Sequence, residues 1–129
     1  MSQLQSYMQA RSNTVAVIDD DEDVRDVLAA LLELGGHDVE TYPSGVQFLR
    51  EAVLDHLACL VVDLNMPGMS GLELATELEN RGVAIPTLLI TGARSAAVRR
   101  QAAGSGVMTV MQKPMCHRQL LRFVASSVH

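Results

Sequence analysis

The sequence predicts one α/β domain, in which a parallel sheet carries helices on both faces. Short apolar runs rich in β-branched residues alternate five times with segments whose apolar residues recur at helical spacing. Strands that alternate with helices in this way favour a parallel sheet covered on both sides. With 129 residues, 48% of them hydrophobic, the chain has enough apolar surface for one packed core.

The strands are expected at residues 15–18, 39–42, 57–62, 87–90 and 107–111. The helices are expected at residues 24–32, 44–53, 72–78, 93–103 and 120–128, and glycines end several of them. Residues 1–13 are polar, so we expect a flexible N-terminal tail followed by one domain at residues 14–129. No apolar run approaches the ~20 residues that span a membrane.

Polar residues follow four of the five apolar runs. The first run ends at Asp19 and Asp20, the third ends at Asp63, the fourth ends at Thr91, and the fifth leads to Lys113. In the doubly wound order 2-1-3-4-5, which is flavodoxin-like (βα)5, strands 1, 3, 4 and 5 are neighbours. The five carboxyl ends share one edge of the sheet, so we expect these side chains to meet there.

These residue types point to phosphoryl transfer. Clustered carboxylates repel one another and favour a hard cation such as Mg²⁺, which also offsets charge on phosphate oxygens. Lys113 and the Thr91 hydroxyl are suited to contact a phosphoryl group. Asp63, alone at the end of a buried strand, is the best candidate for the nucleophile that forms an aspartyl-phosphate.

Each residue also has an ordinary structural explanation. Acids at positions 20–23 suit the start of a helix, where capping and the helix dipole favour negative charge. Asp63 could cap the turn through Pro67 and Gly68, and a lone Thr91 or Lys113 is unremarkable in a turn or on a surface. Their joint occurrence at four neighbouring strand ends favours a site.

The segments VIDDDEDVRDVLAALLELGGHDVETYPSG, LVVDLNMPGMSGLEL, LLITGAR and MQKP resemble the receiver domain of two-component response regulators. The resemblance runs from about Val15 to Phe123. Each motif is weak alone, whereas the four in this order and spacing are specific. The resemblance implies a phosphoacceptor signalling domain that catalyses only its own phosphorylation and dephosphorylation, and is otherwise not an enzyme.

By position, the resemblance makes Asp63 the phosphoacceptor and also a Mg²⁺ ligand. Asp20 matches the direct metal ligand, Asp19 the ligand that acts through water, and Asn65 the ligand that uses its backbone carbonyl. Thr91 and Lys113 match the two phosphoryl contacts, and a cis peptide bond is typical between Lys113 and Pro114. The small Gly92 implies a path for water and therefore loss of the phosphoryl group by hydrolysis.

One position departs from the family pattern. Phe or Tyr usually stands three residues before the lysine, and its ring moves inward as the threonine moves toward the phosphate. Val110 stands there instead, and its β-branched side chain is stiff and cannot make such a ring flip. We therefore expect intact chemistry at Asp63, with an altered switch through Thr91, Val110 and the fourth helix.

The resemblance implies a sensor histidine kinase or phosphotransfer protein as phosphoryl donor, and an output domain or downstream protein as target. It also implies a cytoplasmic location, and it leaves open a homodimer through the fourth helix, fifth strand and fifth helix. The net charge of −5 disfavours direct binding of nucleic acid by this domain.

Two other functions remain open from the sequence. One is a Mg²⁺-dependent phosphatase with an aspartate nucleophile at the first strand; its Asp-x-Asp-x-Thr/Val motif would read Asp19 to Asp23 here, with an acid at the last place. The other is a receiver-like interaction module that is not phosphorylated, which Val110 leaves open. The sequence names neither the kinase nor the target, and does not distinguish a free-standing receiver from part of a longer regulator.

Overall fold

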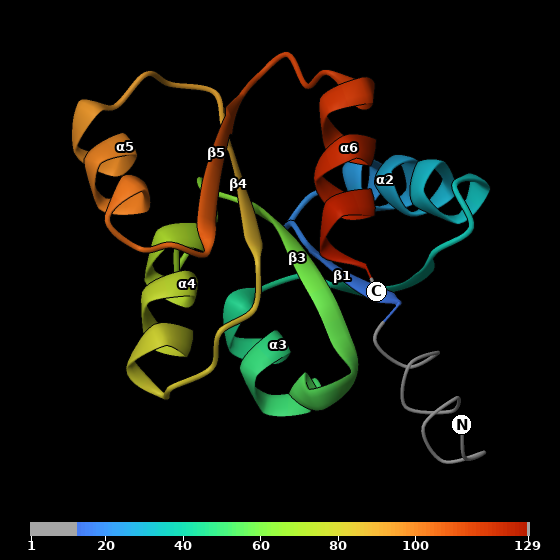
Figure 1. Ribbon diagram of the computed structural model, residues 1–129, viewed down its shortest axis with the longest axis horizontal. Helices are drawn as coiled ribbons and strands as arrows, with labels where there is room; N and C mark the ends of the chain where they lie inside the picture. Colours follow the sequence, from blue (N-terminus) through green and yellow to red (C-terminus); the bar gives the residue numbers. More distant parts are fainter. Residues whose placement is uncertain (1–12, 129) are drawn as a thin grey trace.

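Five parallel strands form one sheet in the computed structural model, which describes residues 13–128 (Figure 1). They are β1 (Thr14–Ile18), β2 (Asp38–Tyr42), β3 (Leu57–Asp63), β4 (Thr87–Thr91) and β5 (Met108–Gln112). Their order across the sheet is β2-β1-β3-β4-β5, and every neighbouring pair is parallel. This order confirms the predicted fold class.

Helices connect the strands and cover both faces of the sheet. They are α2 (Glu22–Leu34), α3 (Gly45–Glu51), the 3-10 helix η1 (Leu54–His56), α4 (Gly71–Asn80), α5 (Ala96–Ala103) and α6 (His117–Ser127). Buried side chains of α2 and α6 pack in one apolar cluster, and those of α3, α4 and α5 pack in the other. The two clusters lie on opposite faces of the sheet, as in a doubly wound fold.

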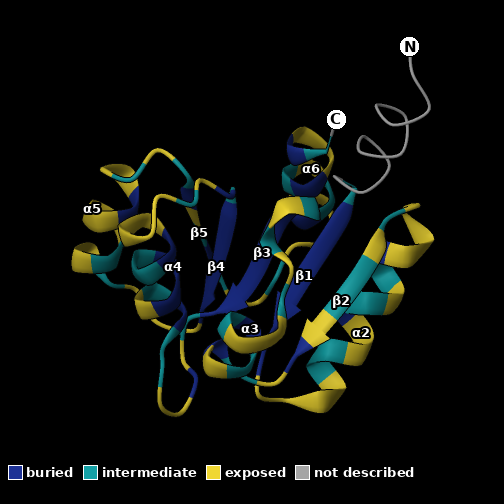
Figure 2. Cartoon of the chain, turned by 90° about the horizontal axis from the view of Figure 1, so that it is seen from below, coloured by how far each residue is buried: buried dark blue, intermediate teal, exposed yellow. Residues whose placement is uncertain are grey.

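The central strands β1 and β3 are buried along their whole length, as the dark blue arrows of Figure 2 show. Successive side chains of β1 alternate between the faces: Val15 and Val17 lie in the cluster with α2 and α6, whereas Ala16 and Ile18 lie in the other. Apolar residues on both sides hold these strands, and so their carboxyl ends, in fixed positions.

Side-chain caps start most of the helices. The capping side chains are Asp21 for α2, Ser44 for α3, Ser70 for α4 and Ser95 for α5. Each accepts a hydrogen bond from a backbone N–H that the helix itself leaves unsatisfied. At α4, the Glu73 side chain also accepts from the amide of Ser70, which completes a capping box.

Some element boundaries differ from the prediction. Helix α5 begins at Ala96 rather than Ala93, because the Thr91 hydroxyl bonds to both the amide and the carbonyl of Ala93 and fixes a turn there. Helix α3 ends at Glu51, and the short helix η1 occupies residues 54–56, where none was expected.

The predicted polar tail at residues 1–13 lies outside the described residues except for Asn13. That residue is anchored, since its amide nitrogen donates to the carbonyl of Gly36 at 3.3 Å and its Oδ1 lies 3.2 Å from Nδ1 of His37. Within residues 13–128, no helix is both long and apolar enough to cross a membrane.

Candidate functional site

The carboxyl ends of four neighbouring strands bring the predicted site residues together. Asp19 directly follows β1, Asp63 ends β3, Thr91 ends β4, and Lys113 directly follows β5. The backbone amide of Lys113 donates to the carbonyl of Thr91 at 2.7 Å, so the pairing continues past the last strand position. β2, whose end carries no candidate residue, lies at the far edge of the sheet.

Three carboxylates gather at this edge. Oxygen atoms of Asp19, Asp20 and Asp63 all lie within 4.8 Å of one another, the one such cluster of potential ligands found in residues 13–128. Asp19 and Asp63 are buried, whereas Asp20 is exposed, so the cluster is open to solvent on one side. Carboxylate oxygens suit Mg²⁺, and three negative charges this close favour a cation among them. These residues therefore fit a divalent metal ion.

The surroundings of Asp19 disfavour the charged form of its carboxyl group. Only 5% of the residue is exposed, and this burial raises the pKa of its carboxyl above the ordinary 3.8. The amide of Asp21 donates to Oδ1 of Asp19 at 2.9 Å and lowers the pKa, while the charges of Asp63 and Asp20 raise it further. The net upward direction means that the fold holds this charge at a cost when no cation is near.

Asp63 is a buried carboxylate with one cationic neighbour. The residue is 7% exposed, and its Oδ1 lies 3.7 Å from Nζ of Lys113. The same oxygen accepts a hydrogen bond from the amide of Asn65 at 3.2 Å. The hydrogen bond from Asn65 agrees in part with the structural explanation for Asp63, in which its carboxylate caps the turn that follows β3. Lys113, however, comes from beyond β5 and has no part in the turn.

The Thr91 hydroxyl is occupied by two local hydrogen bonds in this conformation. Thr91 is 2% exposed, and its Oγ1 both donates to the carbonyl of Ala93 and accepts from its amide, each at 3.1 Å. A shift toward Asp63 would break both hydrogen bonds. The Lys113–Pro114 peptide bond is cis, as the resemblance implied.

Val110 is half-buried and pairs with Leu89 across the β4–β5 ladder. It packs against the apolar cluster that includes Ala102 of α5. No aromatic side chain within residues 13–128 belongs to β4, α5 or β5, so none there stands in for the missing ring.

Two residues contact the site although no sequence pattern predicted a role for them there. The Arg25 guanidinium on α2 donates to the carbonyl of Asp19 at 2.6 Å and ties the first helix to the end of β1. Gly71 starts α4 directly against the end of β3, where a Cβ atom would lie 2.5 Å from the carbonyl oxygen of Asp63. Each contact joins the first turns of a helix to the end of the strand before it, and its geometry depends on how the connecting loop folds, so neither follows from the hydrophobic pattern.

Residues 15–125 match the family described as the response regulator receiver domain. The chain belongs to this family. Among curated relatives, transcriptional regulatory protein FixJ of Azorhizobium caulinodans is 37% identical over 114 residues, which cover 88% of this chain and 54% of that protein. Transcriptional regulatory protein TdiR of Thauera aromatica is 32% identical over 125 residues, covering 97% of this chain and 55% of that protein. This receiver domain therefore spans about half the length of the curated relatives it matches.

Solved structures agree with this assignment. The response regulator StyR superposes with a TM-score of 0.81 at 35% sequence identity, over 89% of this receiver and 58% of that chain. The structure named FixJ-N superposes with a TM-score of 0.74 at 30% identity, over 89% and 92% of the two chains. Receiver domains of response regulators are signalling domains that generally bind Mg²⁺ at an acidic pocket.

Proposed function

We propose that Asp63 accepts a phosphoryl group from the phosphohistidine of a sensor histidine kinase or phosphotransfer protein. In this step a carboxylate oxygen of Asp63 forms a bond to phosphorus, and the bond between phosphorus and the histidine nitrogen breaks. The observation that carries the proposal is the position of Asp63, buried at a strand end between two carboxylates and Lys113.

The acidic cluster is proposed to hold Mg²⁺. Asp20, Asp63 and the backbone carbonyl of Asn65 would be its direct ligands, with Asp19 acting through water. When bound, the ion supplies positive charge that offsets the charge on the phosphoryl oxygens. The exposed side of the cluster, at Asp20, leaves room for ion and phosphoryl group to enter.

Lys113 and Thr91 are proposed to receive the phosphoryl group. The Lys113 ammonium would pair with a phosphoryl oxygen on Asp63, and its distance of 3.7 Å from Oδ1 of Asp63 supports this role. Thr91 would exchange its two hydrogen bonds with Ala93 for one to the phosphoryl group. That movement would free the turn before α5 and shift the face formed by α5, β5 and α6, the predicted fourth and fifth helices with the strand between them.

Val110 is proposed to alter this readout, because it cannot follow Thr91 inward as a ring would. Structures with and without a phosphate mimic would test the idea in the native chain and in Val110→Phe. We expect a smaller displacement of α5 in the native chain than in the variant. Equal displacement in both would exclude a role for Val110.

Loss of the phosphoryl group by hydrolysis is proposed to need access for water beside Thr91. Gly92 is exposed, and the nearest atom to a Cβ built there is Cδ of Lys113 at 4.0 Å. A side chain would therefore fit at this position and narrow the approach to Asp63. Gly92→Arg should lengthen the lifetime of the aspartyl-phosphate, measured as the decay of label after the donor is removed.

A phosphoryl donor could dock on an apolar hollow beside the site. Val24, Leu28 and Met115 line this hollow together with Asp19 and Lys113, so an apolar contact adjoins the acidic cluster. The relatives are transcriptional regulatory proteins about twice as long as this receiver, which supports an output domain or a downstream protein as the target.

Labelling with a small radioactive phosphodonor tests the whole proposal. We expect Mg²⁺-dependent incorporation of label into the wild type, and none into Asp63→Asn or in the presence of a chelator. Asp55→Asn is the matched control, because Asp55 is exposed in η1, before β3 begins. Equal labelling of Asp63→Asn would exclude Asp63 as acceptor. Steady phosphomonoester turnover that depends on Asp19 would instead favour the phosphatase.

A further inference from the structure

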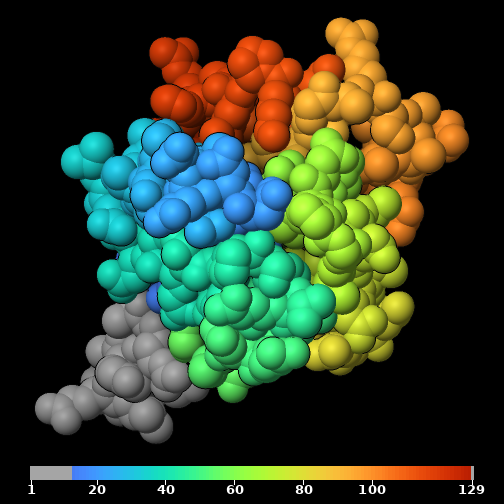
Figure 3. All heavy atoms as spheres, turned by 180° about the vertical axis from the view of Figure 1, so that it is seen from behind, coloured from blue at the N-terminus to red at the C-terminus, as the bar shows by residue number. Residues whose placement is uncertain are grey.

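Charge is segregated along this chain and therefore over its surface. All fifteen acidic residues precede Asn80, whereas seven of the ten lysines and arginines follow it. The acid-free segment forms β4, α5, β5 and α6. Figure 3 shows the atoms of α5, in orange, and α6, in red, along one edge of the molecule. The segment from β4 to α6 contains six of the ten lysines and arginines of the chain.

Five arginines of this edge are exposed and make no ion pair with any residue in the range 13–128. They are Arg94, Arg99, Arg100, Arg118 and Arg122, and we call them the arginine face. Three ion pairs occur among the described residues, and Lys113 with Asp63 is the only one that includes a residue from the segment between the start of β4 and the end of α6. The arginines are thus available to a partner.

The two arginines of α6 occupy positions that disfavour the isolated domain, whereas Arg100 lies in the last turn of α5, where a cation is favourable. Arg118 stands in the first turn of α6, where the helix dipole is positive and a cation is unfavourable. Arg118 and Arg122 are four residues apart on the same helix, a like-charge spacing that also destabilises. Helices α2 and α4, by contrast, begin with acids. Residues that lower the stability of a protein at their own position are expected at surfaces that bind a partner.

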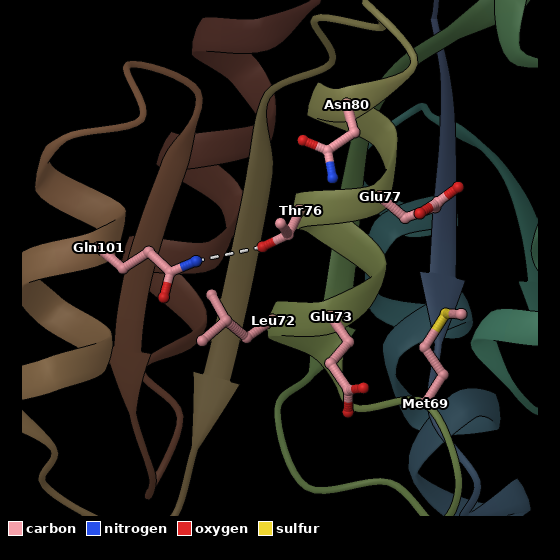
Figure 4. A pocket seen from close by; sticks show the side chains of 7 residues that line it. All are labelled: Met69, Leu72, Glu73, Thr76, Glu77, Asn80 and Gln101. Carbon is pink, nitrogen blue, oxygen red and sulfur yellow. Dashed lines mark hydrogen bonds between the residues drawn. The ribbon is translucent and has the colours of Figure 1, made fainter.

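Neighbouring acids do not neutralise this face. Glu73 and Glu77 of α4 line a pocket to which α5 contributes Gln101, and Figure 4 shows the Glu77 side chain pointing away from α5. The Gln101 amide donates to the Thr76 hydroxyl at 3.2 Å, a neutral contact. Glu77 already pairs with Arg81 at 2.9 Å, and Glu79 accepts from the Ser105 hydroxyl. The acidic residues therefore stay on the α4 side.

We propose that the arginine face binds an acidic surface of another protein. A symmetric dimer of this chain through α5, β5 and α6 would set arginines against arginines with no acid on either copy of those elements, so it is disfavoured. Carboxylates on a partner would give each guanidinium a paired, charge-assisted hydrogen bond. The binding itself does not depend on phosphorylation of Asp63.

A protein fits better than a nucleic acid. A phosphate backbone would extend past the arginine face toward the acidic remainder of the molecule, which is repulsive within a Debye length of ~10 Å at 0.1 M salt. Single strands also need aromatic platforms, and Phe123, half-buried on α6, is the one aromatic side chain among α5, β5 and α6. An acidic protein surface makes neither demand.

The test is a titration of the full chain with three labelled probes: a helical peptide with glutamates along one face, the same peptide with lysines instead, and a duplex DNA. We expect binding of the glutamate peptide alone, with amide shifts confined to α5, β5 and α6, and weaker binding as salt rises. Arg118→Glu with Arg122→Glu should weaken it about tenfold, as expected for loss of two exposed charge pairs.

The control is the paired substitution Arg50→Glu with Arg81→Glu, which changes the net charge equally on α3 and at the end of α4, and should leave affinity unchanged. Circular dichroism checks that both variants fold, and Asp63→Asn should bind like the wild type. No binding of the glutamate peptide, or equal loss in the control, would overturn the proposal. The proposal would also be overturned if DNA bound more tightly than the glutamate peptide. Self-association at low salt that the Arg118 and Arg122 substitutions abolish would overturn it as well.

Discussion

A methyl group at Gly71 would press on the backbone that carries Asp63. The added Cβ would lie 2.5 Å from the carbonyl oxygen of Asp63 and 3.0 Å from Cα of Leu64. Backbone atoms cannot rotate aside, so Gly71→Ala must displace either the end of β3 or the start of α4. Such overpacking costs about 1–3 kcal/mol. A contact of 2.5 Å with backbone belongs at the upper end of that range, and the higher helix propensity of alanine returns up to about 1 kcal/mol, which leaves a net loss of about 2–3 kcal/mol.

Urea unfolding of Gly71→Ala measures the loss, and labelling of Asp63 shows whether the displaced strand end still reacts. We expect a lower midpoint together with slower labelling. Gly104→Ala is the matched control, because its Cβ would meet only ordinary contacts at 3.7 Å and its φ of −79° suits alanine. That change should be neutral or stabilise by up to about 1 kcal/mol. Wild-type stability and labelling in Gly71→Ala would refute the packing argument.

Three further changes test the core and the site. Asp19→Asn, measured with a chelator present, should stabilise the fold by about 1–3 kcal/mol at neutral pH, because it removes a charge that is disfavoured by burial and by the carboxylates of Asp63 and Asp20 within 4.8 Å. Folding raises the pKa of Asp19, so this gain in stability should vanish as the pH falls below 3.8, where the carboxyl is protonated in both the folded and the unfolded protein. An unchanged urea midpoint at pH 7 would contradict the predicted gain. Burial raises the pKa of Cys59 to about 12, so a thiol reagent should modify only the exposed Cys116 until the protein unfolds. The same shift should make stability fall as the pH rises from 9.0 toward about 12, since only the unfolded thiol ionises there. Phe48→Ala should cost about 3–5 kcal/mol in urea, since the ring is fully buried and meets Tyr42 edge-on at 5.2 Å, and a loss below about 1 kcal/mol would be inconsistent with that packing.

The sequence predicted the sheet and the meeting of site residues because both depend on local patterns. An apolar run such as 57–62 identifies a buried strand, and the residue at its end, Asp63, then has its place set by topology. Strand order 2-1-3-4-5 sufficed to bring Asp19, Thr91 and Lys113 to the same edge. No side-chain detail was needed for that step.

Individual side-chain hydrogen bonds and very short helices could not be predicted in this way. Arg25 looks like any exposed helical arginine until the end of β1 is placed beneath it. The sequence predicts that α5 starts three residues earlier than it does, because alanines favour a helix locally. In the structure the Thr91 hydroxyl instead holds Ala93 in a turn. Helix η1 is too short to show a periodic pattern.

The paired hydrogen bonds between Thr91 and Ala93 also bear on how often the unmodified protein adopts the alternative conformation. A net hydrogen bond contributes about 0.5–1.5 kcal/mol, so giving up both costs about 1–3 kcal/mol. If Thr91 acts as proposed, roughly one unmodified molecule in six to one in 160 would already have the hydroxyl turned toward Asp63. Phosphorylation would then enlarge an existing minority rather than create a new conformation, and a basal output in the absence of any kinase follows from the same equilibrium.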